Sequence, residues 1–140
     1  MSIATILLPV FVQVALTFVL IFTLGTSRMA VLKRGEVRIP DIALGQRVWP
    51  ARQQQISNCY DNQFQLPVLF YVLTVLAIIT RHADYLFVVL AWIFVVSRLV
   101  HAYIHCTTNY VRYRFLSFAI GLIVLIAMWA IFAAQILAGV

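Results

Sequence analysis

Four long apolar runs constrain this chain more than any other feature of its sequence. The first run extends from Ile3 to Gly25 without a charged residue, and the last extends from Phe115 to Gly139, also without one. Two further runs lie at residues 66–80 and 85–104. About 20 apolar residues in a helix span a hydrocarbon core of ~30 Å. The sequence therefore predicts an all-α integral membrane protein, a four-transmembrane-helix bundle with up-down-up-down topology. The expected helices, within a single domain of residues 1–140, lie at about 3–27, 52–80, 84–106 and 112–138.

A cleaved signal peptide is the alternative for the first run. Such a peptide begins with a basic segment and ends at a small-residue cleavage site. No basic residue precedes Ile3, and Arg28 follows the run. We therefore expect a retained transmembrane helix.

The basic residues are distributed unevenly between the two sides of the expected bundle. Of the 140 residues, 64% are hydrophobic and 10% are charged, against roughly 25% charged in soluble domains. Nine of the ten Lys and Arg residues, all except Arg81, fall on the side of the first and third connections. The positive-inside rule makes that side cytoplasmic, which places both termini on the outer side. The net charge is +6, but the charged residues lie in the segments between the apolar runs and form no basic patch on a soluble face. We therefore expect the lipid bilayer as a partner and no nucleic acid.

Two of the expected helices carry polar side chains within their apolar spans. Both stripes have the spacing i, i+3, i+7, which places each stripe on one helix face. They consist of Asn58, Asp61 and Gln65 on the second helix, and of Arg98, His101 and His105 on the third. Ionisable groups within a span usually face a bundle interior or a watery cavity, because their burial in lipid is costly. The two stripes are therefore expected to line a common cavity, although snorkelling or interhelical bonding is the structural alternative.

The short turn at residues 81–84 makes the second and third helices an antiparallel hairpin. Counting along straight helices from this turn brings Asp61 opposite His101 and Gln65 opposite Arg98. Pro67 is expected to bend the second helix. The two histidines lack a third ligand in the sequence, so we expect no metal site.

The two cysteines, Cys59 and Cys106, fall near the cytoplasmic ends of their helices. A stable disulfide is not expected in a reducing compartment. Each is interpreted as a small apolar side chain that fills the core.

The third helix carries the motif Arg98-Leu-Val-His101-Ala-Tyr-Ile-His105, and Arg114 follows nine residues later. This pattern resembles that of the MAPEG family, the membrane-associated proteins in eicosanoid and glutathione metabolism, and the resemblance covers essentially the whole chain. It implies a bacterial-type inner-membrane member that assembles as a homotrimer, and in such a membrane the charge distribution places both termini on the periplasmic side. It also implies that Arg114 stabilises a glutathione thiolate, that Arg98 and His101 form the wall of the glutathione site, and that Arg28 contacts the ligand.

A second segment, Asn62-Gln-Phe-Gln65-Leu-Pro67, is similar to a second pattern of the family, in which Asn-x-x-Glu is followed by a proline. Here Gln65 replaces the acid, Asn58 stands where the family has an arginine, and His105 stands where it has a tyrosine. The resemblance implies glutathione as co-substrate and a transferase or peroxidase acting on a small lipophilic electrophile. The alternatives are a catalytically silent binding or scaffold protein of the same fold and, last, a small transporter or channel.

Overall fold

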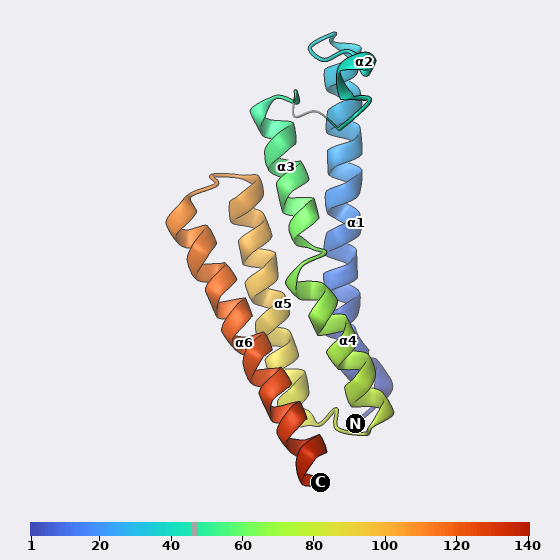
Figure 1. Ribbon diagram of the computed structural model, residues 1–140, viewed down its shortest axis with the longest axis vertical. Coiled ribbons are helices and arrows are strands. Elements are labelled where there is room, and N and C mark those ends of the chain that lie inside the picture. The colour runs from blue at the N-terminus through green and yellow to red at the C-terminus, as the bar shows by residue number, and fades with distance from the viewer. Residues whose placement is uncertain (46–47) are drawn as a thin grey trace.

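The computed structural model describes residues 1–45 and 48–140, and it is built from helices (Figure 1). Four helical segments are long and apolar enough to cross a membrane, and no β-strand occurs in the described ranges. The helices are α1 (Ile3–Lys33), α2 (Ile39–Ile42), α3 (Ala51–Asn62), α4 (Leu66–Ile79), α5 (Tyr85–Cys106) and α6 (Val111–Ala138). This arrangement confirms the predicted all-α, four-span membrane architecture.

The chain runs up through α1, down through α3 and α4, up through α5 and down through α6 (Figure 1). Both termini and the α4–α5 turn therefore lie at one end of the bundle. The other end carries the α1–α3 and α5–α6 connections, and most of the basic residues lie in these connections or in the helix turns that adjoin them. Arg47, which the charge argument counted, lies outside the described residues.

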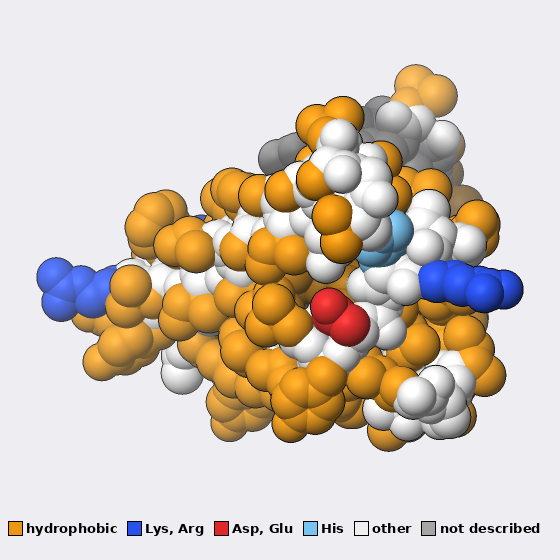
Figure 2. All heavy atoms as spheres, turned by 90° about the horizontal axis from the view of Figure 1, so that it is seen from below, with side chains coloured by type: hydrophobic (Ala, Val, Ile, Leu, Met, Phe, Trp, Pro, Cys, Tyr) orange, Lys and Arg blue, Asp and Glu red, His pale blue; other side chains and the backbone are white. Residues whose placement is uncertain are grey.

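Helix α5 is the central element of the bundle, since it packs against α1, α3 and α6. In the most apolar stretch of α5, 50% of the residues are buried, whereas the corresponding share is 22% in α1 and in α6. The apolar core includes Phe70 and Leu73 of α4, Phe94 of α5 and Leu125 of α6. Many large apolar side chains remain exposed on the outside of the bundle, as expected for a surface that contacts lipid. The end that carries the termini is also covered mostly by hydrophobic side chains (Figure 2).

Helix α1 continues to Lys33, about one and a half turns beyond the predicted end. Residues 28–34 contain no Gly or Pro, and the following Gly35 has a φ of 75°, in the left-handed region. The amide of Gly35 donates to the Leu32 carbonyl at 3.1 Å, and that of Glu36 donates to the Val31 carbonyl at 3.3 Å. These bonds form a Schellman motif, which ends the helix. The connection between α1 and α3 contains the short helix α2.

Replacing Gly35 with alanine is expected to lower the free energy of unfolding by about 1–2 kcal/mol, because a residue with a Cβ is strained at this φ. Thermal unfolding in detergent measures the effect. The matched control is Gly25→Ala, because Gly25 lies within α1 and an added Cβ meets no atom within 4 Å. Equal losses in both variants would show that the left-handed turn does not explain the end of the helix.

The second transmembrane segment is not one continuous helix as predicted over residues 52–80. It breaks between α3 and α4, where the amides of Gln63, Phe64 and Gln65 each donate three residues back rather than four. Pro67 follows, and its missing N–H leaves the Gln63 carbonyl without its regular helical donor. The expected bend at Pro67 is therefore a break, and it lies inside the membrane span.

A buried pair of side-chain amides joins α1 to the chain at this break. Gln13 and Gln63 are almost completely buried, and Gln13 Nε2 donates to Gln63 Oε1 at 2.9 Å. Gln63 Nε2 in turn donates to the Cys59 carbonyl at 3.0 Å. The sequence analysis did not single out Gln13, although a lone amide within an apolar span is a signal for an interhelical bond.

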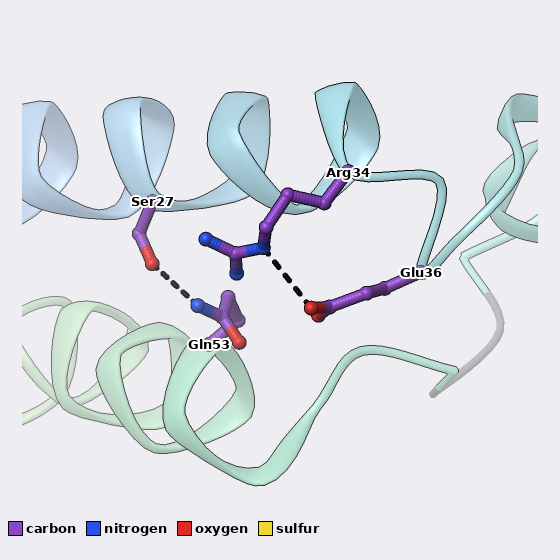
Figure 3. A network of polar contacts seen from close by, with 4 residues as sticks. All are labelled: Ser27, Arg34, Glu36 and Gln53. Atoms are coloured by element: carbon purple, nitrogen blue, oxygen red, sulfur yellow. Dashed lines mark hydrogen bonds and ion pairs between the residues drawn. The ribbon is translucent and has the colours of Figure 1, made fainter.

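The opposite end of α3 is also joined to α1 by polar contacts. Figure 3 shows Ser27 of α1 facing Gln53 of α3, and Gln53 Nε2 donates to Ser27 Oγ at 2.7 Å. Arg34 and Glu36 pair at 3.0 Å next to these residues. The Gln53–Ser27 bond and the Gln13–Gln63 pair hold α3 along α1 and leave its other face free to form a site.

Candidate functional site

A polar cavity of about 540 Å³ opens between α3, α5 and α6. Its volume is in the usual range of small-molecule sites, about 300–1,000 Å³. Seven of the nine candidate residues from the sequence line it. The complete lining is Asn58, Asp61, Asn62, Gln65, His101, His105, Val111, Arg114, Phe115 and Phe118.

The α3 wall of the polar cavity arises from helical periodicity. Asn58, Asp61 and Asn62 recur on one face, and Gln65 follows at the break. Asn62 Nδ2 donates to Gln65 Oε1 at 2.9 Å, which ties the break to the last turn of α3. Asn58, Asp61 and Gln65 are exposed in the single chain, so the cavity is open on this side.

Arg98 is completely buried and lies behind the cavity wall rather than in it. Its Nη2 atom donates to the Asn62 backbone carbonyl at 3.4 Å and also to Asn62 Oδ1. The sequence predicted Gln65 as the partner of Arg98. The break between α3 and α4 shifts the residues of α3 relative to α5, so Asn62 accepts the hydrogen bonds from Arg98, and Gln65 is connected to Arg98 only through its own bond with Asn62. The guanidinium thus lies at the C-terminal end of α3, where free carbonyls and the helix dipole favour a cation.

Arg98 has further hydrogen-bonding capacity. Its Nε and Nη1 atoms are buried without a partner among the described residues. The ion pairs found in residues 1–45 and 48–140 are Arg34–Glu36 and Arg38–Asp41, both in the α1–α3 connection. No carboxylate of the described chain therefore neutralises Arg98, and the region behind the cavity wall is electropositive.

The α5 wall consists of His101 and His105, both buried. Their rings lie edge to face with centroids 5.5 Å apart, and the His101 ring is 5.8 Å from that of Phe118. The Nδ1 atom of each histidine is buried and lacks a partner in the described structure. His101 and Asp61 line the same cavity, as the sequence suggested, but the hydrogen bonds of the described residues include none between them. Each of these ring nitrogens acts as a donor or an acceptor, depending on the tautomer.

Arg114 enters the cavity from the first turn of α6. Its Nη1 atom donates to Asn109 Oδ1 at 2.6 Å, which orients the guanidinium. Asn109 has a φ of 50°, a left-handed conformation that asparagine tolerates better than most residues. The sequence analysis missed Asn109, although an asparagine between two helices is a usual turn signal.

Arg28 lies outside the polar cavity, in a neighbouring pocket of about 300 Å³. Its Nη2 atom donates to Ser57 Oγ at 3.2 Å, and its guanidinium lies 4.6 Å from the centroid of the Trp49 ring. Asn58 and Asp61 line both spaces, so the two are adjacent. A direct contact between Arg28 and a ligand would require the ligand to extend past Asp61.

The combined geometry suits a polar ligand with both anionic and cationic groups. Arg114 lines the cavity, unpaired donors of Arg98 lie behind its wall, and Asp61 is the carboxylate in its lining. Phe115 and Phe118 add an apolar wall that the sequence analysis also missed, because their position depends on how α6 packs. No group of three His, Cys, Asp or Glu residues suited to a metal ion occurs among the described residues.

The model of the MAPEG family matches residues 6–134 of the chain. No curated protein and no solved structure gives a significant match.

Proposed function

This chain belongs to the MAPEG family, and we propose that it binds glutathione in the polar cavity and activates its thiol against small lipophilic electrophiles, as a transferase or peroxidase. One observation carries the proposal. Polar stripes from α3 and α5, together with Arg114 of α6, converge on one cavity within a bundle that is otherwise apolar.

Thiol activation is the chemical task that Arg114 would perform. A free thiol has a pKa of about 8.5, and the thiolate is the nucleophile. A guanidinium beside the sulfur stabilises the thiolate by charge and by hydrogen bonding. Asn109 holds the Arg114 guanidinium in place, so little reorganisation is needed when the thiolate forms.

The other cavity residues complement the charged ends of glutathione. Asp61 would pair with the ammonium group of the tripeptide, while Gln65 and Asn62 would bond its amides. His101 and His105 line the same space. The Gln65 amide forms a weaker bond to an ammonium group than a carboxylate does. Asp61 therefore carries this role alone in our proposal.

Phe115 and Phe118 would form the electrophile side of the site. Phe115 lines the cavity and is also 67% exposed on the outside of α6, so the rim of the cavity borders the surface that faces lipid. A lipophilic substrate dissolved in the bilayer would enter across this rim. Glutathione would enter from the end that carries the basic connections.

In the proposed topology the basic end is cytoplasmic, in a bacterial inner membrane, and both termini are periplasmic. We also propose a homotrimer with sites between subunits. The exposed side chains of Asn58, Asp61 and Gln65 support this assembly, because a neighbouring subunit would close the open side of the cavity.

A catalytically silent binding protein is the second candidate. The replacement of the family acid by Gln65 and of the family arginine by Asn58 favours it, since both changes remove charge from the site. A silent member would bind a ligand in the cavity without forming a thiolate.

Glutathione titration of the detergent-purified protein tests the proposal. Calorimetry measures binding, and the ultraviolet absorbance of the thiolate measures activation. Binding with thiolate formation supports the enzyme, and binding without thiolate supports the silent protein. No binding at millimolar glutathione contradicts both in their glutathione form.

Asp61→Asn is expected to weaken glutathione binding about tenfold, because a charge-assisted bond to the ammonium group becomes a neutral one. Calorimetry with glutathione and with an analogue that lacks the amino group measures the difference. The analogue should bind both proteins equally. Asp41→Asn is the matched control, since Asp41 pairs with Arg38 in the α1–α3 connection, away from the cavity. An equal loss for both ligands would remove Asp61 from ammonium recognition.

A further inference from the structure

The two cysteines lie together in the region where α3 packs against the end of α5. Cys59 is completely buried, and its Sγ donates to the Ala102 carbonyl at 3.8 Å. Cys59, Ala102 and Cys106 belong to one apolar cluster. The partly buried Cys106 packs against the buried residues of this cluster, and both thiols are free.

Helix geometry explains this proximity. Cys106 is four residues after Ala102 in α5, so both lie on the same face. The Cα–Cβ bond of a helical residue tilts toward the N-terminus, so the Cys106 side chain leans back over the turn of Ala102. The Cys59 sulfur contacts that same turn.

Three polar bonds hold the two helices in register at this point. Gln55 Nε2 of α3 donates to the His105 carbonyl at 2.6 Å and to the Thr107 carbonyl at 3.1 Å. Arg52 Nη1 donates to the carbonyl of Cys106. These bonds hold the end of α5 against α3 next to the two cysteines.

The two thiols differ in accessibility. Cys106 is partly exposed at the end of α5 and has the Arg52 guanidinium next to it. Reactive cysteines are found in such accessible, electropositive settings. Cys59 is inaccessible from outside, so a reagent can reach it only through Cys106.

We propose that Cys106 and Cys59 form a reversible redox pair, with Cys106 as the attacking thiol and Cys59 as the resolving thiol. The oxidant is a low-molecular-weight disulfide. The Cys106 thiolate attacks one sulfur of that disulfide, forms a mixed disulfide and releases one thiolate. Cys59 then loses its proton, attacks the Cys106 sulfur and releases the second thiolate. Two protein thiols are thus oxidised to one disulfide, while the small disulfide is reduced to two thiols.

The disulfide would join two walls of the polar cavity. Cys59 follows Asn58 directly in α3, and Cys106 follows His105 directly in α5. A disulfide between Cys59 and Cys106 would therefore fix the distance between Asn58 and His105 on the two walls of the cavity. Transient disulfides of this kind are compatible with a reducing compartment, in which stable structural disulfides are rare.

The test exposes the full-length protein in detergent to 2-hydroxyethyl disulfide, a neutral reagent that does not resemble glutathione. Intact mass after thiol alkylation follows the products. Wild type is expected to lose both free thiols without keeping the added group. Cys59→Ser is expected to stop at the mixed disulfide on Cys106, and Cys106→Ser is expected to stay unmodified. Dithiothreitol should restore both thiols of the wild type.

Three results would overturn the proposal. These are a wild type that keeps the added group, a disulfide between two chains on a non-reducing gel, and a folded protein that does not react although the denatured protein does. Cys106→Ala provides a second variant if Cys106→Ser is poorly folded. The reagent and readouts do not involve glutathione binding, so failure of this proposal is distinguishable from failure of the proposed function.

Discussion

Arg114→Ala is expected to abolish formation of the glutathione thiolate at neutral pH. Arg114 is the arginine that lines the polar cavity, and its replacement removes the cation nearest to the proposed position of the sulfur. A charge-assisted hydrogen bond is worth about 1.5–3 kcal/mol, which corresponds to a loss of roughly ten- to a hundredfold in the thiolate fraction. Thiolate absorbance in titrations with glutathione measures the effect. Glutathione affinity should fall by less, because the other cavity residues keep their contacts.

The neighbouring residue Arg112 supplies the matched control. Arg112 is exposed in the first turn of α6 and does not line the cavity. Arg112→Ala changes the net charge by the same amount and should leave the thiolate signal unchanged. Arg114→Lys should recover part of it, because lysine keeps the charge but not the planar donor pair. Equal losses in Arg112→Ala and Arg114→Ala would point to the overall charge of this end rather than to a positioned guanidinium.

Arg98→Met is expected to destabilise the protein by about 2–4 kcal/mol before any ligand is added. The substitution keeps much of the volume but removes the charged donors that bond the backbone carbonyl and side chain of Asn62. Loss of these donors leaves Asn62 Oδ1 without its bond to Arg98, inside the membrane span where such a group is costly, and leaves the Asn62 carbonyl with the Gln65 amide as its remaining donor. Thermal unfolding in detergent measures the loss.

The same variant is also expected to weaken glutathione binding, because Asn62 and Gln65 lose the anchor that positions them in the cavity wall. Arg98 therefore acts as a positioning residue, and Arg98→Lys should rescue binding in part. Arg34→Met is the control: Arg34 pairs with Glu36 at the exposed end of α1, and such surface pairs contribute at most about 1 kcal/mol. An Arg98→Met protein of wild-type stability and affinity would contradict the role of Arg98 at the break.

The membrane spans and the two polar faces were predictable because they depend on local order along the chain. Hydropathy over some 20 residues identifies a span without knowledge of its neighbours. The spacing of Asn58 with Asp61, and of His101 with His105, places each pair on one face of its own helix. For these features, the periodicity of a single helix is sufficient information.

Contacts between helices were predicted less well, and the break at Gln63–Gln65 is the main reason. Matching the stripes by residue count assumes one straight helix from residue 52 to residue 80. The missing N–H of Pro67 and the tight turns before it change the position of every residue on the α3 side. Asn62 therefore takes the place beside Arg98 that the count gave to Gln65.

The sequence by itself determined the number of spans, the concentration of positive charge at one end and the faces of α3 and α5 that carry polar groups. These are properties of each segment alone. Only the tertiary structure decided that Asn109 orients Arg114, that Arg28 lies in a separate pocket and that Cys106 packs against the cluster containing Cys59. Each of these depends on how segments far apart in the chain pack together, and helix periodicity contains no information about the partner that a helix face will meet.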